Sequence, residues 1–278
     1  MSVIVVTDSS ACLSADVANE LGVEVAPLHV FVGGVDLREG VDKIPDGFAA
    51  DGPVTTAGAS PAELTRLYTR ALNRSDGAGV VAVHISRGLS STFDAAHQAA
   101  SELGDRVRVV DSGAVGMGLG YAVLSAARAA ARGESVEAVH DHAVTAAARS
   151  RSFIVVDRLD HLRRGGRIGA AAALLGTALA MKPVLHLSEG KLVLGEKTRT
   201  STKALTKMVE AAAGVAGDKR VALTVHHMLC PERADTVAAL LADRIPQVGE
   251  LQIVPFGAVL GAHVGPGAVG VVICLESS

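Results

Sequence analysis

Hydroxyl-bearing residues follow two of the strands that the sequence predicts. The segment TDSS (residues 7–10) comes directly after the β-branched run 3–6, and SRGLSST (residues 86–92) comes after the apolar run 80–85. Ligands of parallel α/β sheets lie beyond the carboxyl ends of the strands. Hydroxyls and backbone N–H groups at the start of a helix bind anions well. Residues 86–92 are therefore a candidate anion site, with the alternative that Ser90 only caps the helix that follows.

A second hydroxyl segment, Thr55-Thr56, precedes the clearest helix signal in the chain. Pro61 suits the first position of a helix, and Ser60 with Glu63 forms the Ser-x-x-Glu pattern of a capping box. The following apolar residues recur with helical spacing, which predicts one buried face. The threonines are thus placed just outside the start of a helix.

The third polar segment is the basic run RRGGR at residues 163–167. Guanidinium groups bind carboxylates and phosphates with paired hydrogen bonds. The alternative is an ordinary helix C-terminus, where basic residues complement the helix dipole and a glycine provides the cap. The pattern alone leaves both interpretations open.

Several common catalytic motifs are missing from the sequence. It contains no phosphate-binding Gly-x-x-x-x-Gly-Lys-Ser/Thr loop, no His-Glu-x-x-His zinc motif and no Gly-x-Ser-x-Gly nucleophile elbow. His140 and His142 lie in a predicted surface helix without other ligands nearby, so we interpret them as solvated and expect no metal. The run GPGAVG (residues 265–270) matches a dinucleotide-binding pattern in spelling only, because a strand is predicted where that motif requires a helix.

The composition excludes several classes of protein. The chain has 278 residues, a net charge of −3, 49% hydrophobic residues, only 3% aromatic residues and no Trp. A near-neutral chain with few aromatic rings lacks both the charge and the stacking surfaces that nucleic-acid binding uses. A core of this composition is built from aliphatic side chains.

The mean hydropathy of +0.36 raises the question of a membrane span. The longest uncharged run, residues 251–275, contains Pro255, Pro266, His263 and five glycines, so we predict strand, turn and strand there. Residues 1–7 hold no basic segment typical of a signal peptide. Three widely spaced cysteines are typical of a reducing compartment, and we expect a cytoplasmic protein.

Strands and helices alternate in the first half of the chain, which predicts a parallel sheet covered on both faces. The predicted strands there are residues 3–6, 23–32, 80–85 and 107–110. The second half differs: an Ala-rich helical stretch ends near Met181, a hairpin spans 186–193, further strands cover 221–226, 251–255 and 269–275, and helices cover 201–213 and 231–245. We predict two α/β domains, residues 1–155 and 156–278.

The polar segments together resemble the DegV family of bacterial fatty-acid-binding proteins. Matching motifs run in family order along nearly the whole chain, and the runs LDHLRRGGRI (residues 159–168) and HVGPG (residues 263–267) are the most specific of them. The resemblance implies an N-terminal parallel-sheet domain and a C-terminal domain with a mixed sheet. One long-chain fatty acid would lie in an apolar tunnel, with its carboxylate between the domains.

The resemblance also implies a role for individual residues. Thr56 and Ser90 would bind the carboxylate, with Ser86 and Thr92 beside them. Arg167, Arg199 and His263 would lie at the carboxylate or acyl-phosphate end. A separate ATP-dependent kinase would phosphorylate the bound carboxylate for phospholipid synthesis, with transient contact to a membrane or acyltransferase. The chain itself would be a carrier with no catalytic residue and no cofactor besides the fatty acid.

One segment departs from the family pattern. The family has Thr-Ser-Gln-Pro-Ser after the first binding segment, whereas here Ala57-Gly58-Ala59 separates Thr56 from Ser60. Two other functions fit the residues: an enzyme on a small phosphorylated or acyl substrate, with Asp8 or His263 as acid or base, and a carrier of another lipid. Chain-length preference, unsaturation, oligomeric state and the identity of the kinase do not follow from the sequence.

Overall fold

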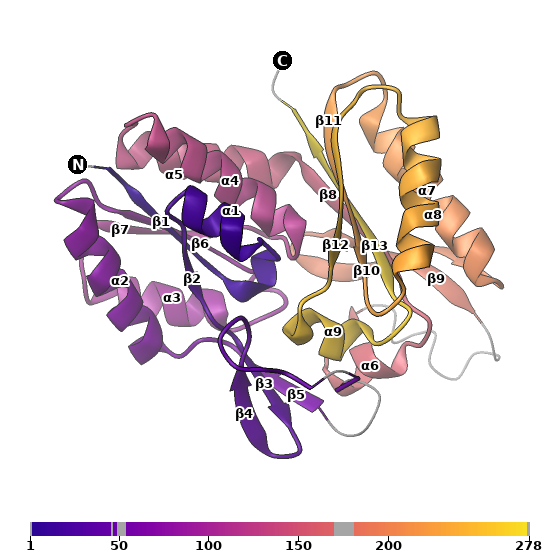
Figure 1. Ribbon diagram of the computed structural model, residues 1–278, viewed down its shortest axis with the longest axis horizontal. Coiled ribbons are helices and arrows are strands. Elements are labelled where there is room, and N and C mark those ends of the chain that lie inside the picture. The colour runs from indigo at the N-terminus through magenta and orange to yellow at the C-terminus, as the bar shows by residue number, and fades with distance from the viewer. Residues whose placement is uncertain (1, 46, 49–53, 170–180, 277–278) are drawn as a thin grey trace. The chain divides into compact units, whose positions relative to one another are not determined.

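The computed structural model describes residues 2–45, 47–48, 54–169 and 181–276. The chain forms two compact units (Figure 1), residues 1–44 with 56–148 and residues 45–55 with 149–278. The Ala-rich stretch that the sequence predicts to be helical before Met181 lies outside the described residues. Each unit has its own sheet and its own core.

The first unit contains a four-stranded parallel sheet in the order β2-β1-β6-β7. Its strands are β1 (Ile4–Asp8), β2 (Glu24–Ala26), β6 (Val80–His84) and β7 (Val107–Asp111). In the centre, Val5 pairs with Val81 and Val6 with Ala82. β6 is buried along its whole length, as expected for a strand covered on both faces. The parallel sheet predicted for this half of the chain is confirmed.

Helices cover both faces of this sheet. α2 (Pro61–Ser75) and α3 (Thr92–Ser101) lie on one face, and α4 (Met117–Ala131) and α5 (Val136–Arg149) lie on the other (Figure 1). The short helices η1 (Ser9–Ala11) and α1 (Ala15–Glu20) follow β1. The capping box is confirmed, since the Glu63 N–H donates to Ser60 Oγ and the Ser60 N–H donates to the Glu63 carboxylate.

A separate three-stranded sheet has the order β4-β3-β5. Its strands are β3 (His29–Val32), β4 (Val35–Arg38) and β5 (Val54–Ala57), of which β3 and β4 belong to the first unit. The prediction of one strand over residues 23–32 is therefore wrong, because β2 and β3 belong to different sheets. Pro27 lies between them and has no N–H to donate to a continuous ladder.

The second unit contains a six-stranded mixed sheet in the order β10-β9-β8-β13-β11-β12. Its strands are β8 (Ser150–Val155), β9 (Lys182–Ser188), β10 (Lys191–Thr198), β11 (Val221–His227), β12 (Val248–Pro255) and β13 (Val269–Leu275). β11 and β12 run parallel, and the other neighbours are antiparallel. Residues 150–155 fall within the predicted N-terminal domain and were not predicted as a strand, but the pairing of β8 with β9 and β13 places them in the second unit.

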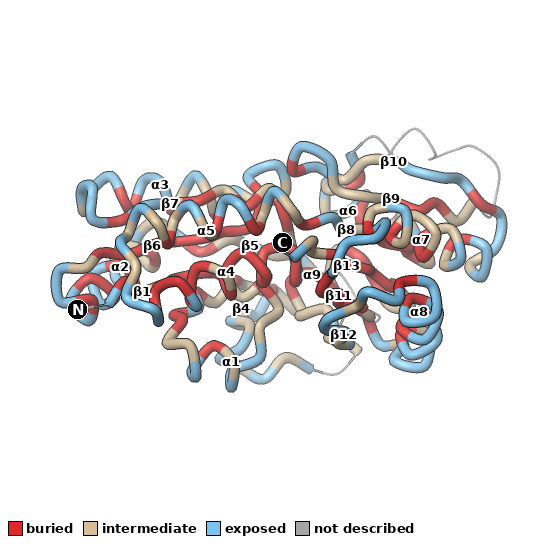
Figure 2. The backbone as a smooth tube through the Cα atoms, turned by 90° about the horizontal axis from the view of Figure 1, so that it is seen from above, coloured by how far each residue is buried: buried red, intermediate tan, exposed pale blue. Residues whose placement is uncertain are grey.

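Two apolar clusters lie on opposite faces of this second sheet. The buried residues of its central strands are red in Figure 2. α7 (Ser201–Ala216) and α8 (Pro231–Arg244) pack on the face that contains Val155. α6 (Asp160–Arg164) and α9 (Ala258–Val264) pack on the face that contains Ile154. The two strands predicted within residues 251–275 are confirmed as β12 and β13, but the segment between them is wrong as a simple turn, because it contains α9. α9 follows Gly257 and is capped by Gly265, whose φ is +74°. Within the described residues, no helix combines the length and the apolarity that a membrane crossing requires.

α4 packs closely on the turn after β1 at one of its glycines, Gly120. A β-carbon at Gly120 would lie 2.8 Å from the carbonyl oxygen of Ala11, whereas one at Gly214 in α7 would meet no atom within 4 Å. Alanine is favoured over glycine by up to about 1 kcal/mol in a helix, because it loses less backbone entropy. We expect Gly214→Ala to raise the thermal unfolding midpoint and Gly120→Ala to lower it. Equal gains for both variants would contradict the close approach at Gly120.

Candidate functional site

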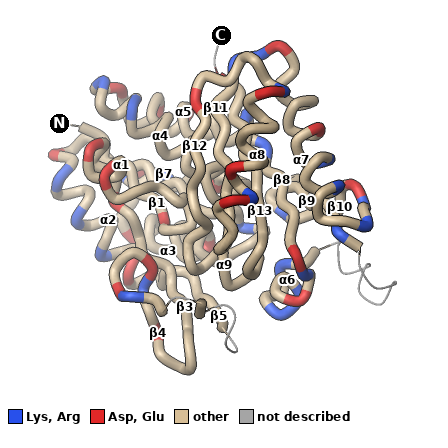
Figure 3. The backbone as a smooth tube through the Cα atoms, turned by 45° about the vertical axis from the view of Figure 1, so that its right-hand side comes forward, with Lys and Arg blue, Asp and Glu red and all other residues tan. Residues whose placement is uncertain are grey.

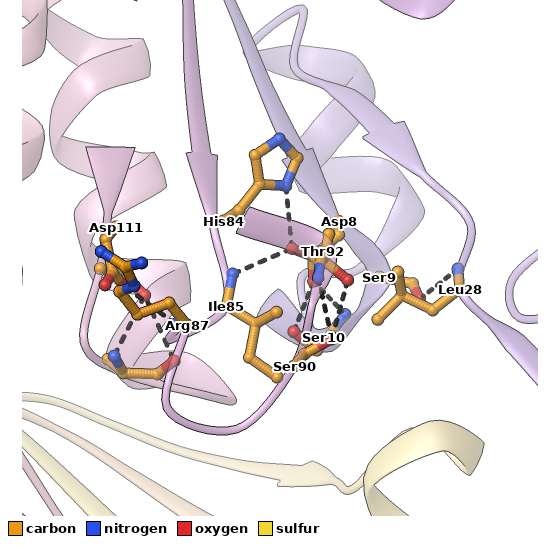
Figure 4. Close-up of polar contacts among 12 residues, drawn as sticks. Asp8, Ser9, Ser10, Leu28, His84, Ile85, Arg87, Ser90, Thr92 and Asp111 are labelled. Atoms are coloured by element: carbon orange, nitrogen blue, oxygen red, sulfur yellow. Dashed lines mark hydrogen bonds and ion pairs between the residues drawn. The ribbon is translucent and has the colours of Figure 1, made fainter. Parts of the chain in front are cut away.

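The Asp8 carboxylate joins the carboxyl ends of β1 and β6 (Figure 4). Asp8 is fully buried. Its Oδ2 accepts a 3.0 Å hydrogen bond from the Ile85 N–H and lies 2.9 Å from His84 Nδ1, while its Oδ1 accepts from the N–H and the hydroxyl of Ser10. These contacts confirm that the segments after the two strands meet at one edge of the sheet. A buried carboxylate that accepts from four donors is satisfied where it lies.

The histidine of this network continues it to α2. His84 Nε2 lies 2.7 Å from the Tyr68 hydroxyl, and both residues are fully buried. Burial raises the pKa of Tyr68, and the negative charge of Asp8 acts in the same direction. Tyr68 therefore keeps its proton and can donate it to His84 Nε2, so both ring nitrogens of His84 have a hydrogen-bond partner. This network was not predicted, because His84 lies within a predicted strand and Tyr68 lies on the apolar stripe of a predicted helix.

The loop after β6 is held by hydrogen bonds within it and by one to the segment that follows β7. The Ser86 N–H donates to the Ala114 carbonyl at 2.9 Å, and the Ser90 N–H donates to the Ser86 carbonyl at 3.1 Å. Ser86 Oγ accepts from the Gly88 N–H at 3.1 Å. Ser86 is thus almost completely buried as a loop anchor, and Ser90 is carried at the far end of a closed turn.

Ser90 and Thr92 form a hydroxyl pair at the start of α3. Their side-chain oxygens lie 2.9 Å apart, and Ser90 Oγ also accepts from the Thr92 N–H at 3.2 Å. The N-cap residue Ser91 makes no side-chain capping bond. Ser90 therefore binds the first N–H of the helix, as the capping alternative expects. It is only half-buried, whereas Thr92 is fully buried.

Gly58 brings the strand that carries Thr56 against this hydroxyl pair. A β-carbon at position 58 would lie 2.5 Å from Thr92 Oγ1 and 3.4 Å from Ser90 Oγ. The chain after β5 therefore approaches Ser90 and Thr92 more closely than a side chain would permit in this conformation. The structure brings the Thr56 segment and residues 90–92 together, and it gives a steric reason for glycine where the family pattern has glutamine.

In the second unit, the basic motif ends α6 beside His263. Gly165 is the C-cap of α6, Gly166 follows with a φ of +70°, and the Arg167 guanidinium donates to the Gly165 carbonyl. Gly165 leaves no room for a β-carbon, because the His263 imidazole lies against it. The helix-C-terminus interpretation is thus confirmed, and the same turn places Arg167 near His263.

The electrostatics of this pair keep His263 neutral at pH 7. Burial lowers the pKa of His263 to about 4, and the positive charge of Arg167 lowers it in the same direction. A neutral imidazole has one donor and one acceptor nitrogen, whereas Arg167 keeps its full charge. The sequence predicted both residues at the anionic end of the ligand, and the structure brings these two together.

A second histidine, His161 of α6, packs against a glycine at the end of α9, just as His263 of α9 packs against Gly165 at the end of α6. The His161 ring of α6 fills the space that a β-carbon of Gly265 would need. His161 Nδ1 accepts from the Arg164 guanidinium at 3.2 Å, and its ring also bonds to the Ala262 backbone. Burial lowers the pKa of His161, and the charge of Arg164 adds to this. His161 was missed in the sequence, although it lies within the LDHLRRGGRI motif that carries the family resemblance.

Among the hydrogen bonds and ion pairs of the described residues, none joins Arg199 to Arg167 or His263. Arg199 is exposed after β10, next to Thr198, which is paired with Lys182. The exposed arginines of α6 are visible in Figure 3. Across the described ranges, no three His, Cys, Asp or Glu side chains gather closely enough to hold a metal ion.

Comparison with known proteins gives one consistent family. The DegV family model, described as an uncharacterised protein family, matches residues 2–276. A DegV domain-containing protein of Mycobacterium tuberculosis is 48% identical over 278 residues, which is 100% of this chain and 99% of that protein. One from Streptomyces coelicolor is 42% identical over 275 residues, which is 98% of each chain.

Solved structures agree with this match. A DegV family protein from Thermus thermophilus, described by its fatty acid binding, superposes with a TM-score of 0.88 at 33% identity, over 99% of this chain and 100% of that one. DegV from Bacillus subtilis, described as a fatty acid binding protein, gives a TM-score of 0.88 at 31% identity with the same coverage. The fold is thus that of a DegV-type α/β protein, and the chain belongs to the DegV family.

The neighbourhood of His263 predicts an unusual titration. We expect its ring to titrate near pH 4 rather than near 6.5, measured by NMR across a pH series. Arg167→Gln should raise the pKa of His263, since one of its two depressing causes is removed. His226 is the internal control. Its pKa is also lowered to about 4, mainly by burial, and Arg167 does not contribute, so the Arg167→Gln substitution should leave it unchanged.

The same two histidines make stability depend on pH. Their folded pKa lies below the ordinary value of about 6.5, so the unfolded chain binds protons more readily. The free energy of unfolding should therefore fall as the pH drops from about 6.5 towards 4, by about 3 kcal/mol for each histidine. Urea unfolding at a series of pH values measures this, and a constant midpoint between pH 6.5 and 4 would contradict it.

Proposed function

We propose that this protein binds one long-chain fatty acid and presents its carboxylate to a separate ATP-dependent kinase. The observation that carries the proposal is the hydroxyl pair of Ser90 and Thr92 against the Thr56 segment, in a chain of the DegV family. The relatives from Thermus thermophilus and Bacillus subtilis, described as binding fatty acids, are 33% and 31% identical over nearly the whole chain.

The carboxylate is proposed to bind the hydroxyls of Thr56 and Ser90. A carboxylate removed from water needs several donors, and hydroxyl groups can turn their protons towards it. The Thr92 hydroxyl supports Ser90, since one of the pair can donate to the other and leave the Ser90 proton for the ligand. Ser86 contributes through the loop, because its carbonyl accepts from the Ser90 N–H.

Arg167, His263 and Arg199 are proposed to act at the same anionic end. Two guanidinium groups and one neutral imidazole bind a carboxylate, and they also suit the added charge of an acyl phosphate. Arg167 and His263 are already adjacent through the α6 turn. The guanidinium of Arg199 is exposed at the end of β10 and has no competing carboxylate partner among the described residues.

The acyl chain needs only apolar surroundings. With 49% hydrophobic residues and 3% aromatic residues, the protein offers aliphatic walls. Each buried CH₂ contributes about 0.8 kcal/mol, so a tail of ~16 carbons gains roughly 10 kcal/mol before the cost of ordering it. We propose a buried tunnel for this tail.

The chain is proposed to be a carrier rather than an enzyme. Asp8, the acid or base of the alternative enzyme hypothesis, accepts from four donors and is fully buried. Phosphoryl transfer to the bound carboxylate is assigned to the partner kinase, and the acyl phosphate would supply phospholipid synthesis in the cytoplasm. A membrane or acyltransferase would then be a transient partner.

The first test is the ligand that the protein carries. Native mass spectrometry of protein purified from bacteria should show about one fatty acid per chain, and lipid extraction should identify it. A protein that is empty and fails to bind added fatty acid would refute the proposal. Turnover of an acyl or phosphorylated substrate by the isolated chain would favour the enzyme alternative instead.

The head-group residues make a second prediction. Thr56→Ala combined with Ser90→Ala should weaken fatty-acid binding by about 1–3 kcal/mol, because a charged carboxylate loses its hydrogen-bond partners. Matched controls are Thr55→Ala and Ser91→Ala, which remove the neighbouring exposed hydroxyls. Calorimetric titration with palmitate measures the change. An unaltered affinity in the double variant, or an equal loss in the controls, would overturn the assignment of the head group.

A further inference from the structure

The residue after Asp8 contacts a different part of the fold. Ser9 Oγ donates to the Glu39 carboxylate at 2.6 Å and accepts from the Leu28 N–H at 3.1 Å. The Glu39 N–H in turn donates to the Leu28 carbonyl at 2.8 Å. Leu28 immediately precedes β3, and Glu39 immediately follows β4. Ser9 therefore fixes the base of the β3–β4 hairpin to the end of β1.

This hairpin carries the strand of Thr56. β3 is the central strand of the order β4-β3-β5, and β5 contains Thr56. A shift of the hairpin at Leu28 and Glu39 is transmitted to β5 through the ladder of β3. The path from Ser9 to Thr56 thus runs through one side-chain anchor and one pair of neighbouring strands.

Asp8 leads to the other head-group residue. Its Oδ2 accepts from the Ile85 N–H at 3.0 Å, and the next residue, Ser86, has the carbonyl that accepts from the Ser90 N–H. The path from Asp8 to Ser90 therefore contains two hydrogen bonds and one peptide unit. Ser10 supports this path by donating to the Asp8 carboxylate from its N–H and its hydroxyl (Figure 4).

We infer that Asp8 and Ser9 are positioning residues that set the two head-group hydroxyls separately, Asp8 through Ile85 for Ser90 and Ser9 through the β3–β4 hairpin for Thr56. The inference rests on the proposed function. Figure 4 shows the two side chains engaging different partners, Ile85 and His84 on one side and Leu28 on the other. Two adjacent residues of one strand end thereby hold two segments that are distant in the sequence.

We call the path from Asp8 to Ser90 the Asp8 arm and the path from Ser9 to Thr56 the Ser9 arm. The two arms differ in the chemistry of the residue at which they start. Asp8 is an anion whose neighbours are the neutral hydroxyls of Ser10 and Tyr68, the imidazole of His84 and backbone N–H groups. Ser9 is a neutral bridge between an amide and a carboxylate. Removing the Ser9 hydroxyl takes away one hydrogen bond on each side without leaving a buried charge unpaired, so Ser9→Ala is the milder substitution.

Double-mutant cycles test whether each arm reaches its own hydroxyl. Ser9→Ala alone should weaken palmitate binding about 3- to 10-fold, the size expected for one lost hydrogen bond. Combined with Thr56→Ala, it should add little further loss, because the positioned hydroxyl is already gone. Combined with Ser90→Ala, the two losses should multiply, since independent sites add in free energy.

The Asp8 arm should show the opposite pattern. Asp8→Asn should add little to Ser90→Ala and multiply with Thr56→Ala. Ser10→Ala, which removes one donor to the Asp8 carboxylate, gives the same comparison in a variant that keeps the charge, in case Asp8→Asn does not fold. Ser9→Thr keeps the hydroxyl and should restore most of the affinity that Ser9→Ala loses.

Hexadecanol separates positioning of the head group from general loosening of the fold. It has the tail of palmitate without the carboxylate, so Ser9→Ala should leave its affinity within about 2-fold, as for contacts outside the altered site. Equal losses for palmitate and hexadecanol, or losses that multiply with Thr56→Ala and Ser90→Ala alike, would overturn the inference. If Thr56→Ala and Ser90→Ala themselves leave palmitate binding unchanged, the head-group assignment of the proposed function has failed, and the positioning inference falls with it.

Discussion

A single buried carboxylate organises the polar end of the first sheet. Asp8 lies where two parallel strands end, and it accepts from the backbone of Ile85, from Ser10 and from His84. Without these donors, a charge with no solvent contact would be strongly destabilising, so strand ends and loop have to stay in register with it. The loop that carries Ser90 begins at this point. The position of the Ser90 hydroxyl therefore depends on a charge that is itself fully buried.

In the second unit, two glycines make room for two histidine rings. His263 lies against Gly165 and His161 lies against Gly265, so the α6 turn and the end of α9 each leave space for the other's imidazole. Burial lowers the pKa of both rings, and the nearby arginines Arg167 and Arg164 act in the same direction. The result is a cluster in which the arginines carry the charge and the histidines stay neutral at pH 7.

Local rules predicted much of this architecture. The β-branched runs became β1, β6 and β7, and the Ser60 capping box became the start of α2. The predictions failed where tertiary contacts decide. The run around Pro27 divides between two sheets, and residues 258–264 form a short helix where only a turn between strands was predicted. The Asp8–His84–Tyr68 network was not predicted, because its members are distant in sequence and both His84 and Tyr68 lie in apolar elements.

The sequence by itself determined the strands of the parallel sheet and the capped start of α2, because strand ends and caps are set by local chemistry. Its ordered motifs also carried the resemblance to the DegV family, which in turn implied the mixed sheet. Only the tertiary structure decided how the polar residues at the candidate site are used. It separated Ser90, which is half-buried, from Asp8, which is fully committed to buried donors, although both follow predicted strands. It also revealed why position 58 is glycine, since the space for a side chain is taken by Thr92. Burial and close approach depend on residues far apart in the chain, and no local pattern contains them.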